Sequence, residues 1–215
     1  MFKTLKITLA LFSLVALTIA PLVYADHAEK AAFFEEITIV GNKDRARMMP
    51  GSAHFIADDE LEVFSYADIQ QILRQVPGVN LQLEDGYGLR PNIGIRGVQT
   101  ERSGRIMLLE DGVPVAPAPY AASSAYYFPT AGRMYSMEVL KGPAAITEGP
   151  NTIGGAINMI STPIPEQAEG KVIAEIGGDA TTRVHAAYGS TGSNGFGYLL
   201  ETHQWKSDGF QSIDG

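Results

Sequence analysis

Hydrophobic residues with helical spacing occur in one short stretch of the chain. Four apolar residues stand at positions i, i+3, i+4 and i+7, which places them on one face of a helix. They are Ile69, Ile72, Leu73 and Val76. Residues 65–68 have the pattern of a capping box before this run, and Pro77-Gly78 ends it. The pattern predicts a helix over residues 66–76 that buries its apolar face.

Short β-prone runs separated by turn residues fill most of the region from residue 42 to residue 165. The expected strands are residues 93–95, 105–110, 113–115, 137–140 and 156–160. Asp111-Gly112 is a hairpin signal, and Pro114 places the returning strand on a sheet edge. We expect a turn at residues 58–60 and one helical turn within residues 142–150. This mixture predicts an α+β domain over residues 42–165.

Alternation of apolar and polar residues replaces this pattern in residues 166–215. Three runs alternate, over residues 171–176, 183–188 and 196–205. Two structures fit them: strands of a transmembrane β-barrel, with apolar side chains outside, or strands of a soluble sheet. Three strands cannot close a barrel, because small barrels need about eight. We therefore interpret the chain as an N-terminal fragment of a longer protein.

The first 25 residues have the composition of an export signal. Lys3 and Lys6 precede an apolar run over residues 7–20, and residues 23–25 form a small-x-small cleavage site. The run is short for a membrane span, which needs about 20 apolar residues. The pattern therefore favours a secretory signal peptide over residues 1–25, with a membrane anchor as the alternative.

A β-prone run at residues 35–41 follows a polar tail that starts at residue 26. Two interpretations fit this run. It is either an ordinary first strand, or a segment that adds to the edge of a partner's sheet.

Composition and charge narrow the possible functions. The formal net charge is −8, which disfavours nucleic-acid binding because phosphate contacts need clustered Lys and Arg. The sequence has no Cys, which excludes disulfide scaffolds, thiolate zinc sites and Cys nucleophiles. An exported chain without Cys fits a bacterial periplasm or outer membrane.

The sequence lacks the motifs of several common enzyme classes. It has no Gly-x-Ser-x-Gly elbow, no Ser-x-x-Lys and no Walker glycine loop. Its four His lack metal-ligand spacing. Acidic clusters at residues 58–60 and 84–85 are interpreted as solvated loops, with an adventitious Ca²⁺ site as the alternative. We expect no enzyme, no resident metal and no cofactor.

Four segments, in order along the chain, resemble the plug domain of a TonB-dependent outer-membrane receptor. They are LRQVPGV at residues 73–79, NIGIRG at 92–97, LLEDGVPV at 108–115, and MEVLKGP at 137–143 together with GGAIN at 154–158. The resemblance implies a plug of mixed strands and helices inside a 22-stranded barrel, whose first strands are residues 166–215. It also implies uptake of a ligand, usually an iron chelate, without catalysis.

The resemblance also assigns the run before the plug to a partner. In this family a TonB box precedes the plug, and the similar residues here are Glu36, Ile37, Thr38, Ile39 and Val40. This favours the partner-binding interpretation of the run within a periplasmic tail over residues 26–41. The implied partners are TonB with its inner-membrane proton-motive motor proteins, the ferric chelate and outer-membrane lipid.

The remaining site residues follow from arginine chemistry and from the same resemblance. Residues 89–97 and 118–120 are similar to the ferric-citrate and iron-siderophore receptor class. Alternatives are other TonB-dependent ligands, namely vitamin B12, haem or carbohydrate, and a secreted soluble α+β binding domain. Arg pairs bidentately with carboxylates, so the candidate ligand-binding residues are Arg90, Arg102, Arg105 and Tyr120. Arg96, Glu138 and Lys141 are expected to join plug to barrel.

Overall fold

The structure is a computed structural model, and the residues it describes are 38–49, 51–64, 69–84, 88, 90–115, 129, 131–149 and 152–209. The predicted signal peptide, Glu36, Ile37, Tyr120 and the expected capping box lie outside these ranges. No helix within them is long and apolar enough to cross a membrane.

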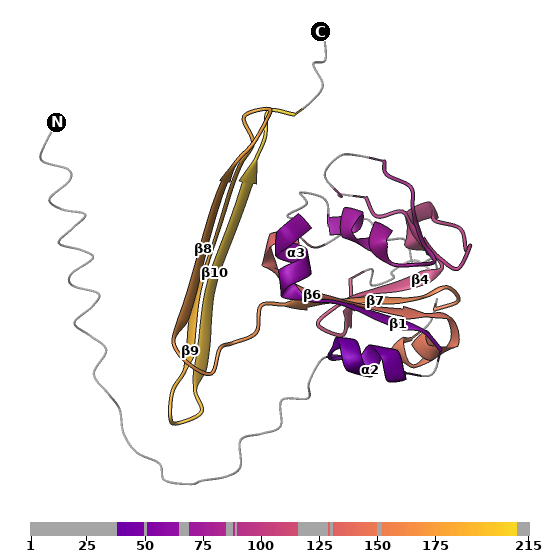
Figure 1. Ribbon diagram of the computed structural model, residues 1–215, viewed down its shortest axis with the longest axis horizontal. Coiled ribbons are helices and arrows are strands. Elements are labelled where there is room, and N and C mark those ends of the chain that lie inside the picture. Colours follow the sequence, from indigo (N-terminus) through magenta and orange to yellow (C-terminus); the bar gives the residue numbers. More distant parts are fainter. Residues whose placement is uncertain are drawn as a thin grey trace, which may run out of the picture. The chain divides into compact units, whose positions relative to one another are not determined.

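A mixed five-stranded sheet forms the centre of the first part of the chain (Figure 1). Its strands lie in the order β1 (Ala53–Ile56), β6 (Met134–Lys141), β7 (Gly155–Ser161), β4 (Ile106–Glu110) and β5 (Val113–Pro114). β4 and β7 are parallel, and the other neighbours are antiparallel. A separate antiparallel pair consists of β2 (Val79–Leu81) and β3 (Ile93–Ile95).

Helical segments cover both faces of this sheet (Figure 1). The helices are α2 (Lys43–Met48) and α3 (Asp58–Phe64), and the 3-10 helices are η1 (Ile69–Gln75), η2 (Glu101–Ser103), η3 (Ala131–Arg133) and η4 (Gly142–Glu148). On one face, η1 and the β2–β3 pair pack against Met137 and Val139 of β6. On the other face, α2 and η4 pack against Leu140 of β6. Alternate residues of β6 therefore serve two different cores.

The expected strands are confirmed, since each of the predicted runs in residues 93–160 overlaps a strand of the structure. The hairpin signal is confirmed as well. Asp111 and Gly112 both have positive φ, at 49° and 75°, and join β4 to β5 through a two-residue turn. Such φ values favour Gly and Asp, and they suit the tight turn of a hairpin. Pro114 lies on the edge strand, as predicted.

The helical predictions need two corrections. The segment expected as a helix over residues 66–76 is a 3-10 helix over Ile69–Gln75 in its described part, with Ile72, Leu73 and Val76 buried as predicted. Residues 58–60 were expected to be a turn, but they are the first turn of α3. The Glu60 carboxylate accepts the Ala57 N–H at 3.2 Å, and acidic residues stabilise a helix N-terminus. Helix α2 was not predicted; the Asn42 side chain caps it by accepting the Arg45 N–H at 2.8 Å.

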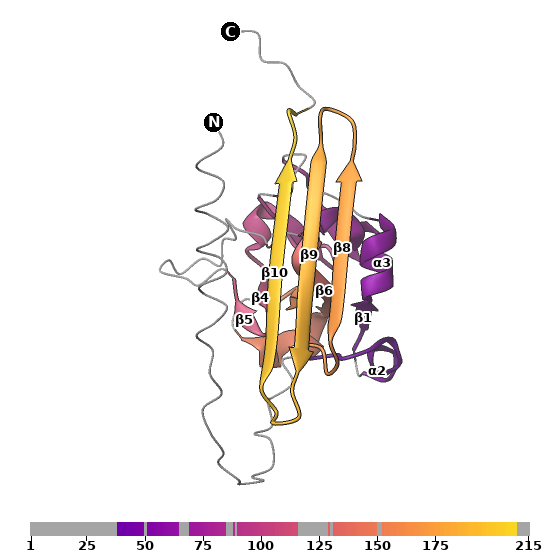
Figure 2. The same cartoon turned by 90° about the vertical axis from the view of Figure 1, so that its left-hand side faces the viewer.

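A second sheet contains β8 (Glu169–Ile176), β9 (Thr182–Thr191) and β10 (Gly197–Lys206), in the order β10-β9-β8 (Figure 2). All of its neighbours are antiparallel. The change from one sheet to the other falls between residues 161 and 169, and the predicted boundary at 165/166 lies within that interval.

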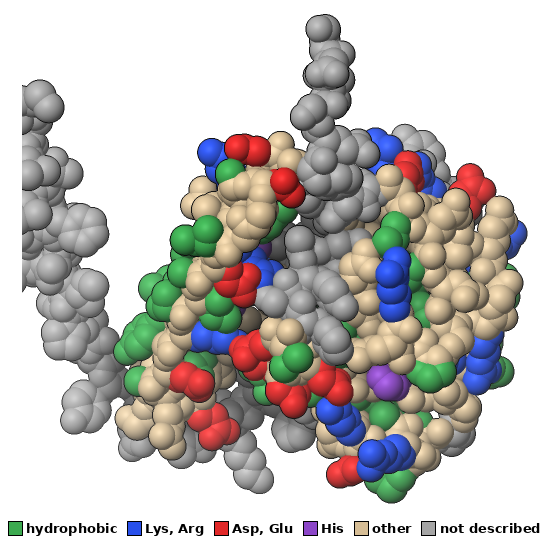
Figure 3. All heavy atoms as spheres, turned by 45° about the horizontal axis from the view of Figure 1, so that its top comes forward, with side chains coloured by type: hydrophobic (Ala, Val, Ile, Leu, Met, Phe, Trp, Pro, Cys, Tyr) green, Lys and Arg blue, Asp and Glu red, His purple; other side chains and the backbone are tan. Residues whose placement is uncertain are grey.

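The second sheet has its apolar face outside. Val172, Ile176 and Leu200 are 77%, 89% and 71% exposed, and hydrophobic side chains run along this face in Figure 3. Arg183 and His185 point to the other, less exposed face, as the alternation predicted. A soluble sheet would bury the apolar face. This pattern favours transmembrane strands, the first of the two interpretations left open by the sequence.

We expect Leu73→Ala to destabilise the first sheet and its helices by about 2–5 kcal/mol, because Leu73 is fully buried and truncation leaves a cavity. Urea unfolding of the protein in detergent measures this change. Leu83→Ala is the matched control, since Leu83 is 37% exposed. A decrease in the free energy of unfolding of less than about 0.5 kcal/mol for Leu73→Ala would contradict the assignment of η1 to the core.

Candidate functional site

The N-terminal segment that contains the predicted TonB box is attached to the sheet by one buried carboxylate. Glu138 of β6 is fully buried. Its carboxylate accepts the backbone N–H groups of Ile39, Val40 and Gly41, at 2.8, 3.0 and 2.7 Å. The described part of the predicted box, residues 38–40, is therefore bent and hydrogen-bonded to the domain, and it is not a strand.

The Glu138 carboxylate is also held from the neighbouring strand. Asn158 lies opposite Glu138 in the β6–β7 register, and its Nδ2 donates to Glu138 Oε2 at 3.1 Å. The Asn158 side-chain oxygen in turn accepts the Gly112 N–H of the β4–β5 hairpin at 3.0 Å. A buried carboxylate needs this many donors to offset its lost hydration. Glu138 was expected to join plug to barrel, but its contacts in the described structure are with the N-terminal segment and β7.

Arg96 and Lys141, the other two residues expected at a plug–barrel contact, lie close together. Lys141 is buried, and its Nζ donates to the Pro77 carbonyl at 2.8 Å. Burial, followed by the nearby Arg96 charge, lowers the pKa of Lys141. The Arg96 guanidinium lies against Gly142, whose φ is +72°, and a Cβ at that position would collide with it. Among the described residues, the structure shows no carboxylate paired with either cation.

Two of the four predicted ligand-binding residues converge on the carboxylate of Glu84, which was expected to lie in a solvated loop. Arg102 donates to both oxygens of Glu84, in the bidentate arrangement, and Arg90 Nη1 donates to Glu84 Oε1 at 3.1 Å. Asn92 Nδ2 donates to Glu84 Oε2 at 3.1 Å. The hydrogen bonds from Arg102, then Asn92 and Arg90, lower the pKa of Glu84 to about 2. Two guanidinium groups thus share one carboxylate.

This arginine cluster lies beside a hollow of about 430 Å³ with mainly polar lining. The lining includes Gln82, Gln99, Thr100 and Glu101. Arg102 itself has a left-handed backbone, with φ of +47°, and its N–H donates to Asn92 Oδ1 at 2.9 Å. Arg105 is exposed at the start of β4, and no contact joins its side chain to Arg90 or Arg102 in the described structure. The structure thus brings together Arg90 and Arg102 but not Arg105, and Tyr120 lies outside the described residues.

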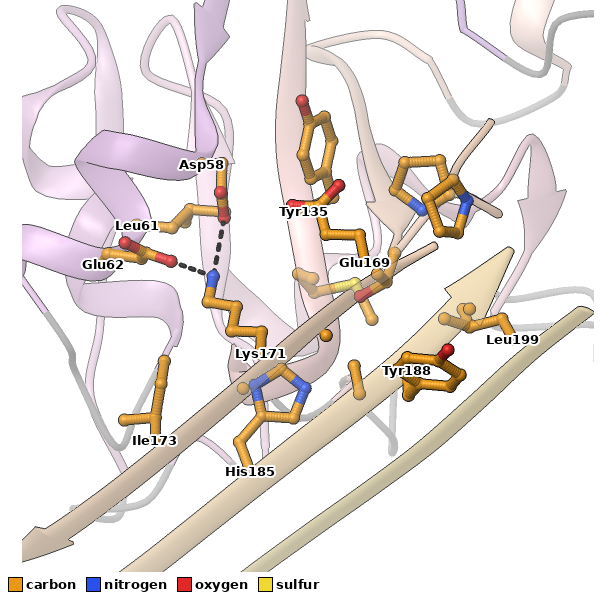
Figure 4. Close-up of a pocket in the computed structure, with 18 of the residues that line it drawn as sticks. Asp58, Leu61, Glu62, Tyr135, Glu169, Lys171, Ile173, His185, Tyr188 and Leu199 are labelled. Carbon is orange, nitrogen blue, oxygen red and sulfur yellow. Dashed lines mark hydrogen bonds and ion pairs between the residues drawn. The ribbon is translucent and has the colours of Figure 1, made fainter. Parts of the chain in front are cut away.

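A larger cavity, of about 590 Å³, separates α3 and β6 from the strands β8 to β10 (Figure 4). Lys171 of β8 spans it and pairs with Glu62 and Asp58 of α3. Near its other end, Glu201 accepts from Thr162 at 2.9 Å and lies 2.8 Å from His185 Nε2. These contacts join the two sheets through polar side chains. Of the predicted ligand-binding residues that the structure describes, Arg90, Arg102 and Arg105 do not line this cavity.

The geometry defines a class of protein: a domain with a mixed sheet, an N-terminal segment bound to that sheet, and membrane-type strands that follow it. Residues 45–156, more than half of the chain, match the family model described as the TonB-dependent Receptor Plug Domain. The chain belongs to this family.

Curated relatives agree with this assignment. The chain is 26% identical over 191 residues to the vitamin B12 transporter BtuB of Vibrio vulnificus strain CMCP6, covering 88% of this chain and 30% of the relative. It is 27% identical over 154 residues to the ferric enterobactin receptor of Pseudomonas aeruginosa, covering 64% of this chain and 20% of that receptor. The chain therefore spans less than a third of the length of these relatives. They are receptors and transporters, not enzymes.

Solved structures share the fold. The unliganded ferric citrate transporter FecA superimposes with a TM-score of 0.63 at 25% identity, over 78% of this chain and 27% of FecA. The siderophore receptor PirA of Acinetobacter baumannii gives a TM-score of 0.56 at 24% identity, over 76% of this chain and 25% of PirA. The expectation of a plug followed by the start of a barrel is thereby confirmed.

Proposed function

We propose that this chain forms the plug and the first barrel strands of an outer-membrane receptor that takes up an iron chelate through coupling to TonB. The observation that carries the proposal is the N-terminal segment. It precedes the family's plug domain and is attached to the central sheet by Glu138, so a pull on it reaches the plug directly.

The inverted strands β8 to β10 support a membrane position. Val172, Ile176 and Leu200 point outward, whereas Lys171, His185 and Glu201 are on the face toward the plug. Within such a barrel, Arg96 and Lys141 would find carboxylates on the barrel wall. A buried Lys is stable when it is paired and hydrogen-bonded, and here the described structure supplies a carbonyl oxygen as its hydrogen-bond acceptor.

The ligand we propose is a carboxylate-rich ferric chelate of the ferric-citrate class. Arg90 and Arg102 both donate to Glu84, and Arg102 and Glu84 line one hollow together with Glu101. An anionic chelate that displaces Glu84 would form bidentate pairs with the same guanidinium groups. Vitamin B12 is the second candidate, because BtuB matches the greater part of this chain.

Coupling to TonB is tested by Ile37→Pro in the receptor, with uptake of radiolabelled ferric chelate as the measurement. Proline removes a backbone donor and fixes φ, so it prevents the segment from adding as a strand. We expect uptake to be lost while ligand binding persists. Ile37 is a better position than Ile39, because Ile39→Pro would also remove a hydrogen bond to Glu138.

Ala31→Pro is the matched control, since it introduces the same residue into the tail outside the predicted box. This variant should transport normally. Normal uptake by Ile37→Pro would refute coupling through the box.

The ligand proposal is tested by titrating ferric citrate into a receptor that carries Arg90→Ala together with Arg102→Ala. A charge-assisted hydrogen bond contributes about 1.5–3 kcal/mol, so we expect the Kd to rise about tenfold or more. Arg47→Ala is the control, because Arg47 is an exposed residue of α2. An unchanged Kd for ferric citrate would exclude Arg90 and Arg102 from ligand binding. Absence of ferric citrate binding to the unsubstituted receptor, with cobalamin bound tightly, would replace the first ligand candidate by the second.

A further inference from the structure

The contact between Glu138 and the N-terminal segment has a geometry that a β-strand cannot adopt. Consecutive N–H groups of a strand point to opposite sides. Here the N–H groups of Ile39, Val40 and Gly41 all converge on one carboxylate. Gly41 has a φ of +82°, and residues 39 and 40 form a bend. These three residues therefore cannot pair with a partner's strand while they are bound to Glu138.

Apolar burial reinforces this attachment. Val40 is fully buried and packs in a cluster with Leu140 of β6, Ala156 of β7 and Leu109 of β4. Ile39 packs against the same cluster. Removing Val40 from the cluster would expose apolar surface and would also leave the carboxylate without three of its four donors. Because both losses would occur together, release of the segment would be an all-or-none step.

We propose that Glu138 is a latch that sets where a strand added by TonB must stop. The latch consists of the Glu138 carboxylate and the N–H groups of Ile39, Val40 and Gly41. While it is closed, the edge offered to the partner ends at Thr38. Force applied by the partner to that edge is transmitted to the sheet at Glu138 of β6. Residues 39–41 become available for strand pairing with the partner only when the latch opens. The identity of the partner in this inference rests on the proposed function. The latch itself rests on the hydrogen bonds to Glu138.

The latch is tested by thiol labelling of Val40→Cys in the membrane-embedded receptor. The 215 residues contain no Cys, so the receptor without this substitution gives the labelling background. With Glu138 intact, we expect the thiol to react slowly with a maleimide, because position 40 is buried. Glu138→Gln keeps the shape but removes the charge and replaces one of the two accepting oxygens by an NH₂ group, which cannot accept the two hydrogen bonds that this oxygen receives. We expect this change to raise the labelling rate about tenfold or more.

Two matched variants separate a latch from a general structural role. Val139→Cys makes the same substitution at a fully buried site on β6, next to Glu138. The proposal predicts that Glu138→Gln exposes Cys at position 40 and leaves Cys at position 139 protected. Equal exposure at both positions would show that Glu138 merely supports the sheet and would overturn the proposal. Glu169→Gln, at an exposed position, controls for the loss of one carboxylate.

The stop position is tested by adding the purified periplasmic domain of TonB. With Glu138 intact, bound TonB domain should leave the labelling of Val40→Cys unchanged, and with Glu138→Gln the added strand should protect it. If TonB changes the labelling rate of Val40→Cys while Glu138 is intact, the paired strand extends past Thr38 and the proposed end of the pairing at Thr38 is wrong. If the labelling result holds but TonB binds neither receptor, the latch stands and the proposed coupling fails. The two claims are thus distinguishable.

Discussion

A carboxylate that is buried without donors is unstable, and much of the plug is arranged around satisfying one such group. Glu138 receives its hydrogen bonds from two sources far apart in the sequence, the segment at residues 39–41 and Asn158 of the adjacent strand. Asn158 also holds the hairpin turn at Gly112. One polar cluster therefore joins the N-terminal segment, two central strands and the β4–β5 hairpin. In the coupling that we propose, force on the segment would reach the sheet through this cluster, because the cluster lies between the arriving chain and the sheet.

The features that the sequence predicted well are those encoded by neighbouring residues. Period-two alternation identified β8 to β10, and Asp111-Gly112 identified a turn whose φ values suit those residue types. Helix α3 was mistaken for a turn because its acidic start satisfies both patterns. Its N-terminal contact with the Ala57 N–H distinguishes the two, and this contact exists only in the folded chain.

The sequence predicted which residues belong to the site but not which of them interact with each other. Glu138 was recognised within a family motif, yet its three backbone partners lie 97–99 residues earlier, and no local pattern connects them. Arg90 and Arg102 were chosen for their chemistry, whereas Glu84, which orients both, had been interpreted as part of a solvated loop. Opposite charges 18 residues apart are common on protein surfaces, so only the path of the chain around β2 and β3 reveals this cluster.

Amide hydrogen exchange at Ile39, Val40 and Gly41 tests most directly whether Glu138 holds the N-terminal segment to the sheet. The measurement requires neither ligand nor TonB and reports on the three N–H groups that the carboxylate accepts. The account predicts exchange at least about a hundredfold slower than in an unstructured peptide, in the range of the core strand β6. Exchange of all three amides at the rate of an exposed peptide would contradict it.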